Sequence, residues 1–204
     1  MKQHPFDLLL FDLGGVLVEN IGLERLSKWL PPVSSPAAVL DRWVTSPTVR
    51  DFERGQMDPV DFATVVVREF ALPLSPERFL ADFSGWASRL YPGAEDLLRR
   101  LSSLCRLGCL SNTNVLHWQR LRGVMKLDRL FDYTFLSCET GLLKPDEKAF
   151  QDVIRNTGFE PARILFFDDI QGNIEGAACA GIVARKASGL PEVHRALRGF
   201  SILP

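Results

Sequence analysis

The stretch Leu8-Leu9-Leu10-Phe11-Asp12-Leu13-Gly14-Gly15-Val16-Leu17 decides how this chain folds. Its first four residues are apolar without interruption, which is typical of a strand buried on both faces of a parallel sheet. The apolar run stops at Asp12, and two glycines follow that allow the chain to turn. We therefore expect a central strand that carries Asp12 at its carboxyl end.

A second apolar run of the same kind lies near the other end of the chain. Residues 164–167 are Ile-Leu-Phe-Phe, and Asp168 and Asp169 follow them. In open parallel sheets ligands bind where the carboxyl ends of neighbouring strands meet, so three carboxylates are expected around one point. Two unit charges about 4 Å apart cost about 4 kcal/mol at an effective dielectric near 20, so the cluster needs a proton, a base or a cation. Ligands that are all oxygen suit Mg²⁺, which prefers to be shared with a substrate phosphate.

Composition limits the classes of function. The 204 residues, 46% of them hydrophobic, suffice for one substantial core and a smaller appendage. A net charge of −1 without any motif of an RNA- or DNA-binding module argues against a nucleic-acid partner, and no apolar run approaches the length of a membrane span or a signal peptide. The cysteines lack Cys-x-x-Cys spacing and are expected to be reduced. We expect a cytoplasmic protein with no membrane or nucleic-acid partner.

The elements after the first strand fall into two groups. Residues 18–87 predict a small all-helical unit without strands: one helix ends at Pro31-Pro32, and others begin after Ser35, Asp58 and Ser75, each followed by proline. From residue 88 onward, strands at 105–110, 133–136, 164–167 and 182–184 alternate with helices. This alternation predicts an α/β fold with a parallel sheet, formed by residues 1–17 and 88–204, with residues 18–87 inserted as a cap after the first strand.

Four polar segments follow in order along the predicted sheet: Asp12, then Ser111-Asn112, then Lys144, then Asp168-Asp169. In these segments the chain resembles the haloacid dehalogenase superfamily, whose members carry such motifs in this order. The resemblance covers nearly the whole chain and implies a Rossmann-like core with a helical cap. Each motif alone is weak, but four in order are specific.

The resemblance also implies roles for these residues. Asp12 occupies the place of the nucleophile that forms an aspartyl-phosphate. Ser111 and the backbone of Asn112 match the phosphate-binding segment, and Lys144 matches the lysine that neutralises the carboxylate and the phosphoryl oxygens. The implied activity is a Mg²⁺-dependent phosphatase that acts on a small-molecule phosphate ester.

The metal site implied by the resemblance contains Asp12, the backbone carbonyl of Gly14, Asp169, and Asp168 either directly or through water. Gly14 is also a departure from the family, because its phosphatases usually have at this position a second Asp that protonates the leaving group. General acid–base help is typically worth about 10²–10⁴-fold, so its loss must be tolerated or replaced. Glu19 is a nearby candidate for replacing it.

The loss of this acid favours a leaving group that departs easily, such as an anomeric sugar oxygen. Glu53-Arg54-Gly55 and residues 111–114, Ser-Asn-Thr-Asn, look like those of bacterial α-D-glucose-1-phosphate phosphatases, which also have Gly at the position of Gly14. A hexose 1-phosphate is therefore the expected substrate. Arg54 in the cap and Asn114 are further candidates for substrate binding, and a surface salt bridge is the alternative for Arg54.

Other functions remain open from sequence. A 2-haloacid dehalogenase uses the same nucleophile without metal and also lacks the second Asp, but it would gain nothing from the adjacent acids Asp168 and Asp169. A catalytically weak protein that binds phosphate esters would bind them tightly without turnover. A phosphomutase depends strongly on the missing acid. Sequence does not separate a monomer from a homodimer.

Overall fold

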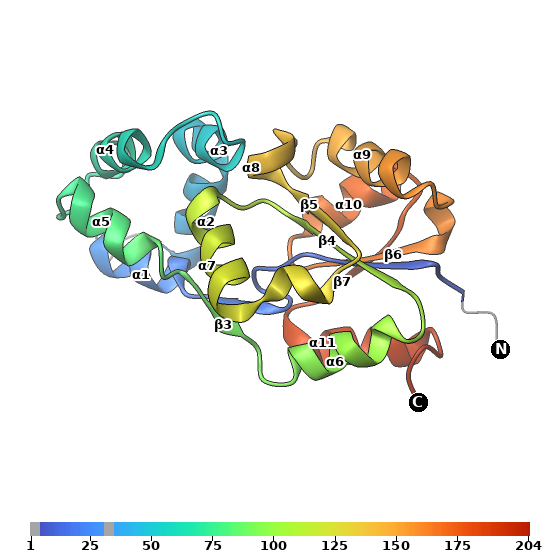
Figure 1. Ribbon diagram of the computed structural model, residues 1–204. Helices are drawn as coiled ribbons and strands as arrows, with labels where there is room; N and C mark the ends of the chain where they lie inside the picture. Colours follow the sequence, from blue (N-terminus) through green and yellow to red (C-terminus); the bar gives the residue numbers. More distant parts are fainter. Residues whose placement is uncertain (1–4, 31–34) are drawn as a thin grey trace.

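The computed structural model describes residues 5–30 and 35–204, and its centre is a five-stranded parallel sheet (Figure 1). Neighbouring strands follow the order β5-β4-β1-β6-β7, so β1 lies in the middle with β4 and β6 on either side. The bounds are β1 (Leu8–Phe11), β4 (Arg106–Ser111), β5 (Tyr133–Leu136), β6 (Ile164–Asp168) and β7 (Val183–Lys186). The α/β fold with a Rossmann-like sheet is thus confirmed.

Helices cover both faces of this sheet, because successive strand residues point to opposite sides. Leu9 and Phe11 pack with α6 (Ala94–Ser102), α7 (Val115–Met125) and α11 (Gly189–Gly199), while Leu8 and Leu10 pack with α9 (Glu147–Thr157) and α10 (Gln171–Cys179). Short helical turns occupy α8 (Ser137–Thr140), Leu127–Leu130 and Pro161–Arg163. Helix α11 was not predicted. No helix in the described ranges is long and apolar enough to cross a bilayer.

Five of the helices between β1 and β4 form a separate layer, which we call the cap: α1 (Gly22–Trp29), α2 (Pro36–Thr45), α3 (Pro47–Glu53), α4 (Pro59–Glu69) and α5 (Pro76–Phe83). Ser35, Ser46, Asp58 and Ser75 each cap one of these helices by accepting a backbone N–H, and proline follows each cap. The predicted stop at Pro31-Pro32 lies outside the described residues. The cap has its own apolar cluster, which contains Phe52, Phe62 and Phe79.

The prediction that residues 18–87 contain no strand was wrong. β2 (Val18–Asn20) pairs antiparallel with β3 (Ala87–Leu90), and Val18 lies opposite Leu90. This two-stranded ribbon of β2 and β3 lies where the chain leaves the five-stranded sheet for the cap and where it returns. Its strands are three and four residues long and carry charged side chains, so neither shows the apolar run that marks β1. The domain limits at residues 17/18 and 87/88 stay a prediction, and both fall at this ribbon.

Candidate active site

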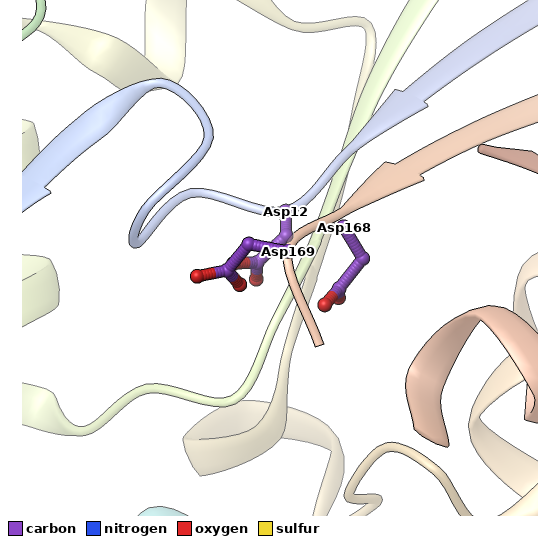
Figure 2. Close-up of side chains that lie close together, drawn as sticks. All are labelled: Asp12, Asp168 and Asp169. Atoms are coloured by element: carbon purple, nitrogen blue, oxygen red, sulfur yellow. The ribbon is translucent and has the colours of Figure 1, made fainter. Parts of the chain in front are cut away.

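Three carboxylates meet at the carboxyl end of the sheet (Figure 2). Asp12 directly follows β1, Asp168 ends the adjacent β6, and Asp169 comes next. One oxygen from each lies within 4.8 Å of the others. Asp12 is 8% exposed and Asp168 is fully buried, so the cluster is held at low dielectric, where like charges repel strongly. The arrangement therefore requires compensating positive charge.

Lys144 supplies part of this charge. Its Nζ donates to Asp12 Oδ1 at 2.7 Å and to Asp168 Oδ2 at 2.6 Å, and the residue is 2% exposed. The side chain of Asn112 holds the Lys144 backbone, because Oδ1 accepts from Lys144 N and Nδ2 donates to Lys144 O, both at 2.9 Å. Burial alone would lower the pKa of Lys144, but the two carboxylates raise it above its ordinary value. The lysine therefore stays charged between the two acids.

Asp168 uses all its acceptor positions within the protein. Its Oδ1 accepts from the Ile170 backbone at 2.8 Å and from Asn173 Nδ2 at 3.0 Å, while its Oδ2 accepts from Lys144 and from the same Asn173 amide at 3.0 Å. A carboxylate offers about four lone-pair sites, so none is left over for a cation. In this arrangement Asp168 positions Lys144, and direct metal binding by Asp168 would require some of these bonds to break.

Asp12 and Asp169 are the carboxylates that remain available. Among the described residues, Lys144 alone donates to the Asp12 carboxylate, and no other residue donates to that of Asp169. Burial raises the pKa of Asp12 to about 7, against the lowering effect of Lys144 and together with repulsion from Asp168 and Asp169. Burial, followed by repulsion from Asp168, raises the pKa of Asp169 as well. Hard oxygen ligands with unbalanced negative charge fit Mg²⁺.

Gly15 lets Asp169 approach the turn that follows β1. Its φ is +77°, a conformation that glycine adopts at little cost. A Cβ built on Gly15 would lie only 2.3 Å from Asp169 Oδ2, so any other residue here would displace this carboxylate. The glycine that the sequence suggested as a turn thus also makes room for the carboxylate cluster.

A cavity of about 500 Å³ opens from the carboxylates toward the cap. Its polar end contains Asp12, Gly14, Asn112, Lys144 and Asp169, and its opposite wall comes mostly from the cap. The apolar lining residues are Leu23, Leu26, Leu40, Trp43, Val44, Trp86, Pro145 and Ile170. A second, more open hollow shares Gly15 and Asp169 but contains neither Asp12 nor Lys144. The first cavity is therefore the candidate substrate site.

The other predicted substrate-binding residues do not line this cavity. Ser111 ends β4 and is 4% exposed, and the described residues give its hydroxyl no hydrogen-bond partner. Asn114 caps α7: its side chain accepts from His117 N at 3.1 Å and contacts the His117 ring. Arg54 lies near Asp51 and Asp146, at 3.7 and 3.8 Å, which corresponds to the salt-bridge alternative.

Two charged cap residues that sequence analysis gave no role do line the cavity: Arg50 and Glu53. They lie three positions apart on α3, so they share one face of that helix. The sequence alone therefore indicates that Arg50 and Glu53 lie on the same face of a helix. Which face of α3 turns toward the sheet depends on how the cap packs, and the sequence pattern does not specify that.

Comparison with known proteins gives a consistent result. Residues 6–181 match the family described as haloacid dehalogenase-like hydrolase. The chain is 28% identical over 183 residues to the sesquiterpene phosphatase astK of Aspergillus oryzae, covering 87% of this chain and 88% of that protein. It is 30% identical over 146 residues to phosphatase MT3486 of Mycobacterium tuberculosis, covering 70% and 67% of the two chains.

A solved structure shares the fold along almost the whole chain. It is a haloacid dehalogenase family enzyme from Bacteroides thetaiotaomicron in complex with magnesium and inorganic phosphate. The TM-score is 0.75 and the identity 24%, and the match covers 93% of this chain and 98% of that one.

Proposed function

This chain belongs to the haloacid dehalogenase-like hydrolase family, and on that premise we propose that it is a Mg²⁺-dependent phosphomonoesterase with Asp12 as the nucleophile. The observation that carries the proposal is the arrangement of Asp12, which is bonded to Lys144 on one side and adjoins the unengaged Asp169 carboxylate on the other. Asp12, Lys144 and Asp169 line one cavity together, which supports the proposed roles of nucleophile, fixed positive charge and metal ligand.

The residues would act in two steps. In the first, the Asp12 carboxylate attacks phosphorus, and the bond from phosphorus to the alcohol oxygen breaks as the aspartyl-phosphate forms. In the second, water attacks the same phosphorus and releases inorganic phosphate. Lys144 Nζ offsets negative charge in both steps, and the Asn112 backbone binds phosphoryl oxygens. The Ser111 hydroxyl, which does not line the cavity, would have to turn toward it to bind them as well. When bound by Asp12, Asp169 and the Gly14 carbonyl, Mg²⁺ supplies further positive charge at the phosphoryl group.

A metal-free dehalogenase is a weaker candidate. That reaction needs a carboxylate to attack carbon but has no use for a second unengaged acid beside it. Asp169 is such an acid, and its burial and its repulsion from Asp168 disfavour its charged form. Binding of a cation would offset this repulsion, and metal binding therefore accounts for an acid at position 169.

The sequence favours a hexose 1-phosphate as the substrate, because Gly14 provides no acid for the leaving group. The cavity wall favours a second candidate, a monophosphate of an apolar alcohol. Leu40, Val44 and Ile170 are 41%, 38% and 42% exposed, and all three line the cavity, so they form an apolar patch there rather than isolated exposed residues. One relative is a sesquiterpene phosphatase. The hydroxyl groups of a sugar would find no hydrogen-bond partners on these three side chains.

Phosphate release from a panel of esters tests the proposal and ranks the substrates. The panel contains glucose 1-phosphate, farnesyl phosphate and p-nitrophenyl phosphate, each with Mg²⁺ or EDTA. We expect Mg²⁺-dependent release, with farnesyl phosphate turned over best, and a loss on the order of 10⁴-fold or more in Asp12→Asn. Asp96→Asn, an exposed change on α6, is the matched control. Chloride release from 2-chloropropionate in EDTA, without phosphate release, would overturn the proposal.

A further inference from the structure

Because residue 14 is Gly, the site lacks the acid with which the family usually protonates the leaving-group oxygen. A poor leaving group then departs slowly unless another residue protonates it. The nearby acid in the sequence, Glu19, does not fill this place. It lies on β2, its Oε2 accepts from Arg89 Nε at 2.8 Å, and it does not line the cavity. A replacement has to face the cavity that holds Asp12.

Glu53 meets that requirement. It is the last residue of α3 and lines the cavity together with Asp12, Gly14 and Lys144. Within the described residues its carboxylate makes no hydrogen bond and no ion pair, although Arg50 lies one turn earlier on the same helix. It is the cap's only acid among the residues lining this cavity, and Asp12 lines the same cavity from the sheet.

The end of α3 is fixed against the sheet region, so the position of Glu53 is not left to a free loop. Gly55 has φ of +72°, and a Cβ there would lie 2.5 Å from the Cys138 carbonyl oxygen, which shows how closely this turn approaches α8. Arg50 and Arg54, on either side of Glu53, both point to Asp146, at 3.9 and 3.8 Å. Asp146 lies two residues after Lys144, so these pairs tie α3 to the segment that carries the lysine.

The surroundings of Glu53 also suit proton donation. Burial raises the pKa of Glu53 to about 7, even though the charges of Arg50, Lys144 and Arg54 act to lower it. The Cys138 thiol of α8 is also near, because the charge of Glu53 contributes to raising the pKa of that thiol, after burial and Glu139. A carboxyl with a pKa near the working pH is present in both protonation states, which is the condition under which one group gives and takes back a proton.

We propose that Glu53 is the general acid and base of the reaction and takes over the function that Gly14 cannot perform. The proposal rests on the proposed phosphatase function. In the first step the Glu53 carboxyl proton passes to the alcohol oxygen as its bond to phosphorus breaks and the bond from phosphorus to Asp12 forms. In the second step the attacking water gives a proton to the Glu53 carboxylate as the aspartyl-phosphate breaks. The cycle leaves one alcohol, one phosphate and Glu53 protonated again.

The test compares esters that differ in how much they need an acid. The p-nitrophenolate of p-nitrophenyl phosphate departs without a proton, whereas the alcohol of cyclohexyl phosphate does not. For Glu53→Gln, with Mg²⁺ present, we compare kcat/KM, which reports the step in which the alcohol departs and not the hydrolysis of the aspartyl-phosphate that both esters share. We expect kcat/KM for cyclohexyl phosphate to fall about 10²-fold and kcat/KM for p-nitrophenyl phosphate to change less than about threefold. The fall in kcat/KM of the wild type on cyclohexyl phosphate as pH rises should be absent in the variant. Glu19→Gln is the matched control and should leave both esters unaffected.

The outcomes separate this proposal from the one on which it rests. An equal loss on both esters would assign Glu53 to substrate binding and overturn the proposal, as would no loss on either. Glu53→Asp keeps a carboxyl group on a shorter side chain, so its activity on cyclohexyl phosphate should fall less than that of Glu53→Gln, again with little change on p-nitrophenyl phosphate. This second variant tests the proposal if Glu53→Gln unfolds at a lower temperature. If the wild type releases phosphate from neither ester, the phosphatase function itself fails, and the role of Glu53 fails with it.

Discussion

The two ends of the cavity are built in different ways. At the sheet end the side chains are charged and held by specific partners: Lys144 bonds two carboxylates, and Asp168 accepts four hydrogen bonds. At the cap end the structure depends on packed rings. Phe52 stacks on Phe62 with centroids 4.0 Å apart, and Trp43 packs against Phe62 and further rings of the cap.

This difference separates two tasks. A hydrogen-bonded charge cluster tolerates few changes, because each removed partner leaves a buried charge uncompensated. A packed apolar wall can change shape by exchanging one apolar residue for another, often at a cost below about 1.5 kcal/mol. The sheet end is thus suited to fixed chemistry and the cap end to the choice of substrate, except for Glu53, which we assign to the chemistry.

Lys144→Met gives the largest expected effect and tests whether the sheet end depends on charge pairing. The change leaves Asp12 and Asp168 buried without their cation, so we expect a loss of about 3–5 kcal/mol in the free energy of unfolding and of about 10³-fold or more in kcat. Urea unfolding and phosphate release measure the two quantities. Lys148→Met, an exposed change on α9, is the control. Unchanged unfolding would mean that the ion pairs do not stabilise this end.

Phe62→Ala tests whether the cap is stabilised separately from the sheet. Phe62 is fully buried, so the cavity left behind should cost about 3 kcal/mol. Hydrogen exchange should show faster exchange in α4 and α5, with protection retained in β1 and β6. Val60→Ala, at a residue that is 65% exposed on the same helix, should change neither. An equal loss of protection in the sheet would show that cap and sheet unfold as one unit.

Gly15→Ala has the smallest expected effect and sharpens the description of the metal site. The new methyl group would meet Asp169 Oδ2, so the Mg²⁺ concentration for half-maximal activity should rise about tenfold, or about 1.4 kcal/mol. Gly141→Ala is matched, because Gly141 has nearly the same φ, +74°, but no neighbour within 4 Å of the added Cβ. If both variants need equally more Mg²⁺, backbone strain rather than contact with Asp169 would be the cause.

The sheet was predictable because its signals are local. The apolar run of β1 and the alternation of strands and helices predicted the α/β fold and brought Asp12, Asp168 and Asp169 to one place. Lys144 was assigned to the same site only through the family resemblance, and the catalytic roles stay predictions. Helix α11 also had a signal, the spacing of Leu190, Val193 and Leu197, which the prediction did not use.

The remaining features depend on packing between distant segments, which single-sequence patterns do not contain. Asp168 and Asp169 are adjacent in sequence, yet only Asp168 bonds Lys144, because neighbouring residues at a strand end point in opposite directions. The position of Glu53 in the cavity follows from how α3 rests on α8, and the ribbon of β2 and β3 pairs residues about 70 positions apart.

The ribbon has a consequence for how such proteins can diversify. Since Val18 lies opposite Leu90, the chain leaves and re-enters the sheet region at adjacent points. A segment with neighbouring ends can be lengthened, shortened or replaced by a foreign one while the strands that follow keep their places. Recombination or protein engineering can therefore exchange the cap at this ribbon, while the catalytic residues of the sheet stay in place.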